Sequence, residues 1–178
     1  MDTNVVIEII IEALKEVNSP RFFKTERGYQ GRFGCAMYEV MDDKGIFPDD
    51  AILEEEYQKR LKEHRTRQRP DLIVHIPTEI SGLANTSKNN FVVFAFKKNA
   101  TLEKAGEDFD KLDVMFKELE YPLGIFINIG TLHTHIDKYR GNYKERLHFF
   151  SVVMKNLELK IVHAFFKNGQ IEKQNISG

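Results

Sequence analysis

The spacing of apolar residues predicts two helices near the start of the chain. Residues 3–17 place their apolar side chains on one helical face, and Asp2 or Thr3 is available to cap that helix. A second helix is predicted over about residues 25–42, although the three glycines in it weaken a helix relative to alanine. Its expected buried positions are Tyr29, Phe33, Ala36, Met37 and Val40.

Short apolar runs predict strands in most of the remaining chain. RPDLIVHIP is typical of a strand because Pro70 disfavours a helix and Pro77 supplies an end. FVVFAFKK and LGIFINIG also favour strands, and the second is apolar on both faces, as in a central strand covered by helices. AILEEEYQKRL favours a strand with a short helix as the alternative, and RLHFFSVVMKN fits either element. The other predicted elements are a helix over 101–119 and a strand in LKIVHAFFKNGQI with a turn at Asn168 and Gly169.

The composition is that of an ordinary globular protein. Of the 178 residues, 42% are hydrophobic and 30% are charged, which excludes disordered and fibrous classes. This length predicts one domain, residues 1–178. The apolar run VVIEIIIEAL contains Glu8 and Glu12 and lacks a basic leader, so a packed helix is expected rather than a signal peptide or a membrane span.

The chain has one cysteine, Cys35. A single cysteine excludes an internal disulfide and a cysteine-rich zinc site, and it fits a reducing compartment, so a cytoplasmic protein is expected. Because its neighbours in GRFGCAMYEVM include many apolar residues, we expect Cys35 to be a buried structural residue rather than a nucleophile.

The net charge of −1 hides an uneven distribution of basic residues. The segment KRLKEHRTRQR, Lys59 to Arg69, carries six Lys or Arg against one Glu. Such a segment can follow phosphates, and it also fits a solvated loop. A second basic stretch, Asp137 to Arg146, includes tyrosines and is a weaker indication of nucleic-acid binding.

An acid and a base are expected to meet on two neighbouring strands. The loop SGLANTSKNN between RPDLIVHIP and FVVFAFKK is compatible with a hairpin, which would bring Asp71 close to Lys97. A carboxylate that holds a divalent cation, together with a lysine that orients or deprotonates the attacking water, can hydrolyse a phosphodiester bond. Metal-assisted phosphodiester hydrolysis is therefore the chemistry that these residues predict.

The order of these elements resembles a known nuclease family. RPDLIVH, a loop, a strand ending in lysine, the helix GEDFDKLDVMF and the strand GIFINIG are similar to the core of the PD-(D/E)XK nuclease superfamily, which has the restriction-endonuclease-like fold. The similarity covers about residues 25–130, preceded by the N-terminal helix and followed by a C-terminal extension. It implies an α/β fold with a mixed sheet flanked by helices, Mg²⁺ or Mn²⁺ as cofactor, a nucleic-acid partner such as DNA, and often a homodimer.

The resemblance assigns roles to residues of the two strands. Asp71 matches the metal-binding aspartate, Lys97 matches the lysine of the (D/E)XK triplet, and the carbonyl of Phe96 would face the metal. Ala95 stands where the family has its second acidic ligand. The triplet therefore reads Ala-Phe-Lys, and one carboxylate is missing.

Three interpretations of Ala95 remain open at this stage. It can be an engineered Glu-to-Ala change that inactivates a nuclease, or a natural loss that leaves a nucleic-acid-binding or assembly module without catalysis. It can also mean that the ligand has moved to another element, with Glu103 and Glu107 on the next helix as candidates.

Further residues are expected to complete such a site. Glu26, followed one turn later by Gln30, resembles the acidic helix residue that the family often adds, and Glu39 is the second candidate. Phosphates are expected to bind Lys98, Arg65, Arg67 and Arg69.

Other chemistries have weaker support. His133 and His135 would share one face of a strand and could hold a metal with Asp137, although two histidines without a clear third ligand are a thin basis for zinc. His75 is expected to be a satisfied histidine of the sheet. A Walker phosphate loop, a serine nucleophile elbow and a Rossmann fingerprint are absent from the sequence.

Overall fold

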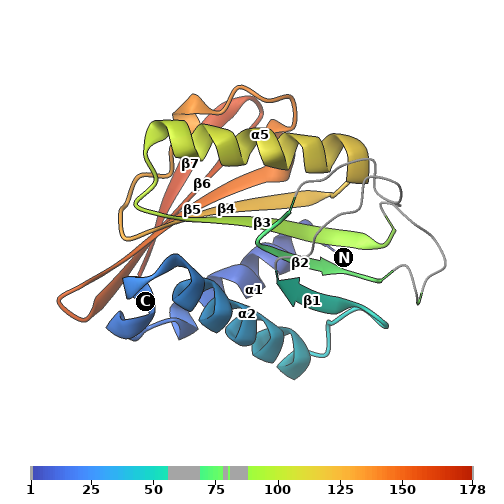
Figure 1. Cartoon of the computed structure of the whole chain (residues 1–178), viewed down its shortest axis with the longest axis horizontal. Helices are drawn as coiled ribbons and strands as arrows, with labels where there is room; N and C mark the ends of the chain where they lie inside the picture. The colour runs from blue at the N-terminus through green and yellow to red at the C-terminus, as the bar shows by residue number, and fades with distance from the viewer. Residues whose placement is uncertain (1, 56–68, 78–79, 81–87, 178) are drawn as a thin grey trace.

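The computed structural model describes residues 2–55, 69–77, 80 and 88–177 (Figure 1). Within these residues seven strands form one mixed sheet, and their order in the sheet follows the order of the chain. The strands are β1 (Ile52–Glu55), β2 (Leu72–His75), β3 (Asn90–Lys98), β4 (Leu123–Ile129), β5 (Leu147–Lys155), β6 (Glu158–Lys167) and β7 (Gln170–Ser177).

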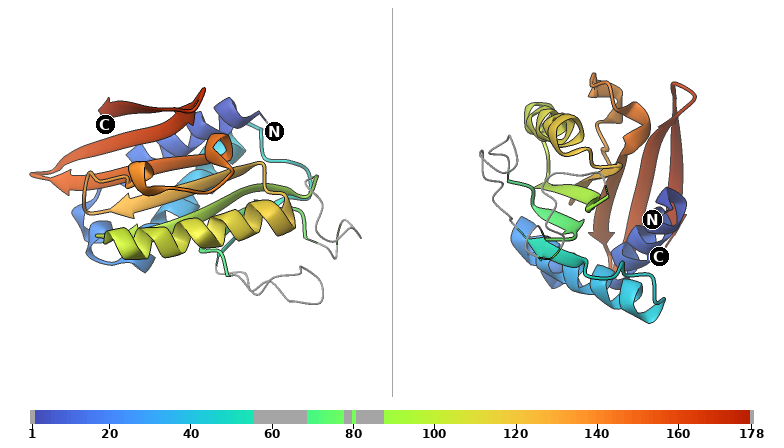
Figure 2. Two further views of the ribbon diagram at one scale, coloured as in Figure 1. Left: turned by 90° about the horizontal axis from the view of Figure 1, so that it is seen from above. Right: turned by 90° about the vertical axis from the view of Figure 1, so that its right-hand side faces the viewer.

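Helices cover both faces of the sheet. α1 (Thr3–Glu16) and α2 (Glu26–Asp43) lie on one face, and α5 (Leu102–Leu119) lies on the other, so the sheet is the middle layer (Figures 1 and 2). This arrangement confirms the predicted mixed α/β sheet flanked by helices. The short 3-10 helices are η1 (Pro20–Lys24), η2 (Ile136–Lys138) and η3 (Lys144–Arg146).

Capping residues set the starts of the three long helices. Asp2, Thr25 and Thr101 each accept a hydrogen bond from a backbone N–H of the first helical turn. Such a bond satisfies one of the N–H groups that has no partner inside the helix. The predicted helix boundaries are therefore confirmed within one or two residues.

The pairing of the strands changes direction twice. β1, β2 and β3 are antiparallel, β3, β4 and β5 are parallel, and β5, β6 and β7 are again antiparallel. The predicted pairing of β2 with β3 is confirmed, and Leu72 lies opposite Phe94. The segment that fitted either a helix or a strand is β5, which places the C-terminal strands in the same sheet as the predicted core.

Residues of β3 alternate between two apolar cores. Phe94 and Phe96 pack under α2, where each ring lies 5.5 Å from the ring of Phe33. Val93 and Ala95 belong to the core under α5. Because successive side chains of a strand point to opposite faces, Lys97 lies on the α5 side of the sheet. This parity brings Lys97 close to side chains of α5.

The expected burial of Cys35 is wrong, because its side chain is exposed. Phe33 and Ala36 of α2 face the sheet and are fully buried. Residues of a helix are separated by about 100°, so Cys35 lies on the opposite side from Phe33. The other inward positions are buried as predicted, except Val40, which is only partly buried.

None of the described helices is long and apolar enough to cross a membrane.

Candidate functional site

Asp71 lies immediately before β2 and is fixed against β3. Its N–H donates to the carbonyl of Phe94 at 3.3 Å, and its Oδ2 accepts a hydrogen bond from the N–H of Phe96 at 2.6 Å. Gln30, a buried residue of α2, donates from Nε2 to the Asp71 carbonyl at 2.6 Å. Backbone and side chain of Asp71 are thus both held in place.

The environment of Asp71 makes its carboxyl easier to protonate than that of an exposed aspartate. The pKa of the carboxyl is raised from 3.8 to about 6, mainly by burial. The N–H of Phe96 and the charge of Lys97 oppose the rise, whereas the charges of Asp108 and Glu26 add to it. A cation beside Asp71 would favour the ionised carboxylate.

Asp108 of α5 is a further acid of this site, and the sequence analysis did not single it out. It follows Ala105 by three residues and precedes Leu112 by four, and all three side chains are buried against the sheet. Glu103 and Glu107, which were the candidates for a relocated ligand, are exposed. The sequence signal that could have revealed Asp108 is an acid at a position of the helix where the spacing predicts an apolar residue.

Two lysines neutralise the Asp108 carboxylate. Lys97 Nζ lies 3.4 Å from Asp108 Oδ2, and Lys111 Nζ lies 2.7 Å from Oδ1. Asp108 Oδ2 accepts no hydrogen bond from the described residues, so its contact with Lys97 is an ion pair. Lys97 Nζ also lies 3.8 Å from Glu26 Oε1.

Lys97 is a cation at neutral pH. Burial lowers its pKa, but the carboxylates of Asp108, Glu26 and Asp71 raise it, and the net pKa lies above the ordinary 10.5. Lys97 therefore offers a proton and a positive charge to the site rather than a free amine.

Ala95 borders a small cavity between the two aspartates. The cavity has a volume of about 20 Å³, and Asp71, Ala95, Asp108 and Lys111 belong to its lining. A space of this size holds one water molecule. The methyl group of Ala95 thus leaves room beside Asp71, and the facing helix supplies a carboxylate at the same cavity.

Glu26 links the start of α2 to the end of β3. Its Oε2 accepts a hydrogen bond from the N–H of Lys98 at 2.8 Å, and Lys98 Nζ donates to the carbonyl of Lys24. Glu39, the other candidate on this helix, instead forms an exposed ion pair with Arg32 at 3.2 Å. Of the two glutamates, only Glu26 contacts the group around Lys97.

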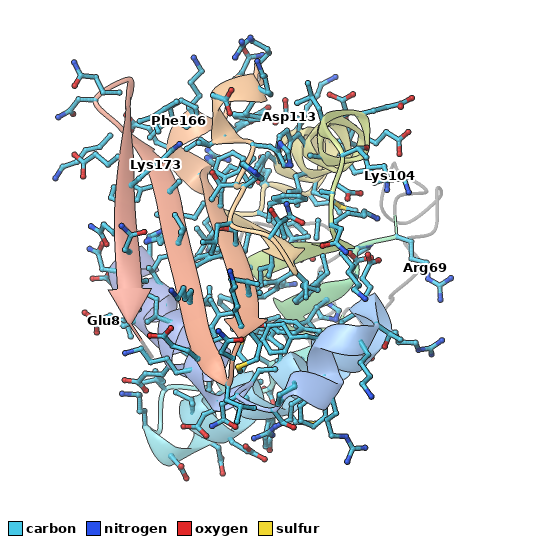
Figure 3. All side chains as sticks on the ribbon, turned by 90° about the vertical axis from the view of Figure 1, so that its left-hand side faces the viewer. Glu8, Arg69, Lys104, Asp113, Phe166 and Lys173 are labelled. Carbon is cyan, nitrogen blue, oxygen red and sulfur yellow. The ribbon has the colours of Figure 1, made fainter. Side chains whose placement is uncertain are left out.

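Basic residues surround the same region. Arg69 is exposed and lines the cavity at Ala95. Arg69 and Lys104 of α5 project on the same side of the molecule (Figure 3). Arg65 and Arg67 lie outside the described residues, as does most of the basic segment Lys59 to Arg69.

The donor set fits Mg²⁺ or Mn²⁺ better than a structural metal. The described residues contain no group of three His, Cys, Asp or Glu side chains that could hold a metal ion. Mg²⁺ uses one or two carboxylates and completes its shell with water and phosphate oxygens. The carbonyl and N–H of a strand residue point to the same side, so the Phe96 carbonyl faces the side of Asp71. Asp71, Asp108 and this carbonyl are therefore the available ligands.

The weaker alternative, a histidine pair on one face of a strand, is wrong. β4 ends at Ile129, and Gly130, with φ of 89°, turns the chain out of the sheet, so His133 and His135 lie in the following loop. Their ring centroids are 6.1 Å apart, and His135 Nε2 contacts the carbonyl of Ala100 at 3.0 Å. Asp137 forms an ion pair with Lys138 and is not part of a described metal group.

His75 is a satisfied histidine of the sheet, as predicted. It is buried, and its Nε2 lies 3.0 Å from Glu54 Oε2 on the neighbouring strand β1. The pair joins two strands and accounts for the polar ring without a catalytic role.

Comparisons with known proteins establish the fold. The chain matches no family model and no curated protein. It is similar to NucC of E. coli MS115-1 in its cAAA-bound form, with 12% identity over 97% of this chain and 82% of that chain and a TM-score of 0.53. NucC of P. aeruginosa ATCC27853, also cAAA-bound, matches with 12% identity over 97% and 81% and a TM-score of 0.46. NucC is a PD-(D/E)XK-type nuclease. The first likeness confirms that this chain has the restriction-endonuclease-like fold.

Proposed function

We propose that this protein is a metal-dependent nuclease that hydrolyses phosphodiester bonds in DNA, with Mg²⁺ or Mn²⁺ held by Asp71 and Asp108. The observation that carries the proposal is the buried Asp108 carboxylate, which reaches the cavity at Ala95 from the facing helix and contacts Lys97. This placement favours a relocated second acid over an engineered inactivation or a natural loss at position 95.

The proposed roles follow from the contacts of each side chain. Asp71, Asp108 and the Phe96 carbonyl would hold the cation, which would supply a water of lowered pKa and would stabilise charge on the phosphate. Lys97, held in its protonated form by the surrounding carboxylates, orients the attacking water and stabilises negative charge on the phosphate. Glu26 is a positioning residue, since it binds the N–H of Lys98 and lies near Lys97.

Phosphates of the substrate are proposed to bind outside the metal ligands. Arg69 lines the cavity, and Lys98 follows Lys97 at the end of β3. Arg65 and Arg67 belong to the same basic segment as Arg69 in the sequence. Contacts of this kind predict DNA binding that weakens as the salt concentration rises.

The test is cleavage of plasmid and single-stranded DNA in Mg²⁺, Mn²⁺ or EDTA. The unmodified chain should cut only with metal, and Asp71→Asn and Asp108→Asn should each lower the rate by about 100-fold or more, as loss of a metal ligand does. Glu107→Gln is the matched control, because Glu107 is an exposed neighbour of Asp108 on the same helix, and it should keep full activity.

Other outcomes would support the competing interpretations. Cutting by Ala95→Glu but not by the unmodified chain would mean that the second ligand belongs at position 95. If neither protein cuts, although both are folded and bind DNA in a salt-dependent way, the chain is a nucleic-acid-binding module without catalysis.

A further inference from the structure

Each oxygen of the Asp108 carboxylate faces a different lysine, and the two lysines are held differently. Lys97 is part of β3 and also lies near Glu26, and 24% of its side chain is exposed. Lys111 is on α5, 46% of its side chain is exposed, and Asp108 is its only ion-pair partner among the described residues. Lys111 is therefore the more easily displaced of the two.

A divalent cation at Asp108 would compete with Lys111. The carboxylate is buried and has two oxygens, and both already face an ammonium group. Positive charges a few ångströms apart in a partly buried site repel each other strongly. The cation and Lys111 therefore oppose each other at Oδ1, whereas Lys97 has the carboxylate of Glu26 as a second partner.

Another partner is available to Lys111 when it leaves Asp108. Lys111 lines the same cavity as Arg69 and Asp71, which is where a phosphate of the substrate is proposed to bind. A lysine side chain is a flexible stem with three donors and can change partners without moving the helix. No rearrangement of α5 is required.

We propose that Lys111 exchanges partners: it neutralises Asp108 before a cation binds, and it contacts a phosphate of the nucleic acid once the cation occupies Asp108. The exchange rests on the proposed nuclease function. The exchange couples binding of the cation to binding of the nucleic acid, because the cation releases the Lys111 ammonium, which can then contact a phosphate. Removal of Lys111 then has opposite effects on the two ligands, with tighter binding of the cation and weaker binding of DNA.

The first measurement is Mn²⁺ binding by isothermal titration calorimetry to the full chain. Lys111→Gln should bind Mn²⁺ roughly two- to fivefold more tightly, in line with the loss of a competing, partly exposed ion pair. Lys117→Gln is the matched control, because Lys117 is on the same helix, 73% exposed, and pairs with Glu118. It should not change Mn²⁺ affinity, and Asp108→Asn should lower it strongly.

The second measurement is fluorescence anisotropy of a labelled DNA duplex over a range of salt concentrations, in EDTA and in Ca²⁺, which prefers the same oxygen ligands. In Ca²⁺, Lys111→Gln should bind more weakly, and the slope of log K against log salt should fall by about one, as for a lost phosphate contact. In EDTA the variant and the unmodified chain should bind alike.

Two results would overturn the exchange: unchanged or weaker Mn²⁺ binding by Lys111→Gln, or an equal loss of DNA affinity in EDTA and in Ca²⁺. Failure of the proposed function looks different. In that case Asp108→Asn would leave Mn²⁺ binding unchanged, or the unmodified chain would bind no Mn²⁺ at all.

Discussion

Asn128 Oδ1 accepts a hydrogen bond from the N–H of Ala100 at 2.9 Å, and this bond ties β4 to the segment that starts α5. Asn128 is fully buried, and its Nδ2 donates to the carbonyl of His133 at 2.7 Å. His135 contacts the carbonyl of the same Ala100. Both backbone groups of Ala100 are therefore held by side chains from one neighbouring segment, just before the helix that carries Asp108.

We expect Asn128→Leu to destabilise the protein and to weaken Mn²⁺ binding. Leucine has a similar volume but leaves the N–H of Ala100 and the carbonyl of His133 without partners, at a cost of about 2 kcal/mol or more. For a domain of this size that corresponds to a fall in Tm of about 4–8 °C. Thermal unfolding and calorimetry measure the two effects.

His135 offers a graded comparison at the other backbone group of Ala100, its carbonyl. His135→Gln keeps a side-chain N–H that can donate to the carbonyl of Ala100, whereas His135→Ala does not. The glutamine variant should bind Mn²⁺ nearly as well as the unmodified chain, and the alanine variant should bind it less tightly. Equal behaviour of the two variants would mean that this contact does not position α5.

A second prediction concerns Gln30, which donates to the Asp71 carbonyl. Gln30→Met keeps the size of the side chain and removes the donor, so we expect a loss of Mn²⁺ affinity of roughly tenfold, as is common when a group that orients a ligand is lost. Arg32→Gln, on the same helix and paired with Glu39 at the surface, is the control and should have no effect.

The cavity at position 95 gives a prediction about charge. Ala95→Glu adds a third carboxylate beside Asp71 and Asp108, so in EDTA it should lower the free energy of unfolding by about 2 kcal/mol, through overpacking and repulsion between like charges. The corresponding fall in Tm is about 4–8 °C. Mn²⁺ should reverse most of this fall. Ala95→Gln separates size from charge, and its Tm deficit should be the same in EDTA and in Mn²⁺.

Local sequence signals were enough to predict the frame of the site. Pro70 and Pro77 delimit the strand that follows Asp71, and the pairing of β2 with β3 brings Asp71 near Lys97, because Asp71 accepts a hydrogen bond from the N–H of the preceding residue, Phe96. Asp2, one of the two residues expected to cap the first helix, caps α1. These features depend on neighbours in sequence or on the pairing of two consecutive strands, and a single sequence contains that information.

For the acid on α5, the spacing of apolar residues indicates that Asp108 is on the buried face, but it does not indicate which residue of the sheet Asp108 meets. The helix carries several acids, among them Glu103, Glu107 and Asp108, and a change of one residue rotates a side chain by about 100°. Which acid meets Lys97 depends on how α5 lies on the sheet, and that is fixed by distant contacts such as the bond between Asn128 and Ala100. Tertiary packing therefore decided the part of the site that sequence periodicity left open.

The C-terminal strands contain a histidine pair that predicts how stability depends on pH. His148 Nδ1 and His163 Nε2 are 2.9 Å apart, and the rings stack on each other and on the rings of Phe150 and Phe165. Burial lowers the pKa of His148 from 6.5 to about 4. Burial, together with the charge of His148, lowers the pKa of His163 to about 3. Both rings are therefore neutral in the folded protein near neutral pH.

The free energy of unfolding should fall as the pH drops below 6.5. Between pH 6.5 and about 3 the unfolded chain binds more protons at these histidines than the folded chain does, and each proton favours unfolding. Asp71 acts in the opposite direction, because its pKa of about 6 in the folded protein stabilises the fold as the pH falls toward 3.8. Urea unfolding of the double variant His148→Gln, His163→Gln should show a flatter decline between pH 6.5 and 4 than the unmodified chain. Asp71→Asn, which removes the opposing group, should show a steeper one. If the histidine variant declines as steeply as the unmodified chain, the buried pair does not set the acid sensitivity of this fold.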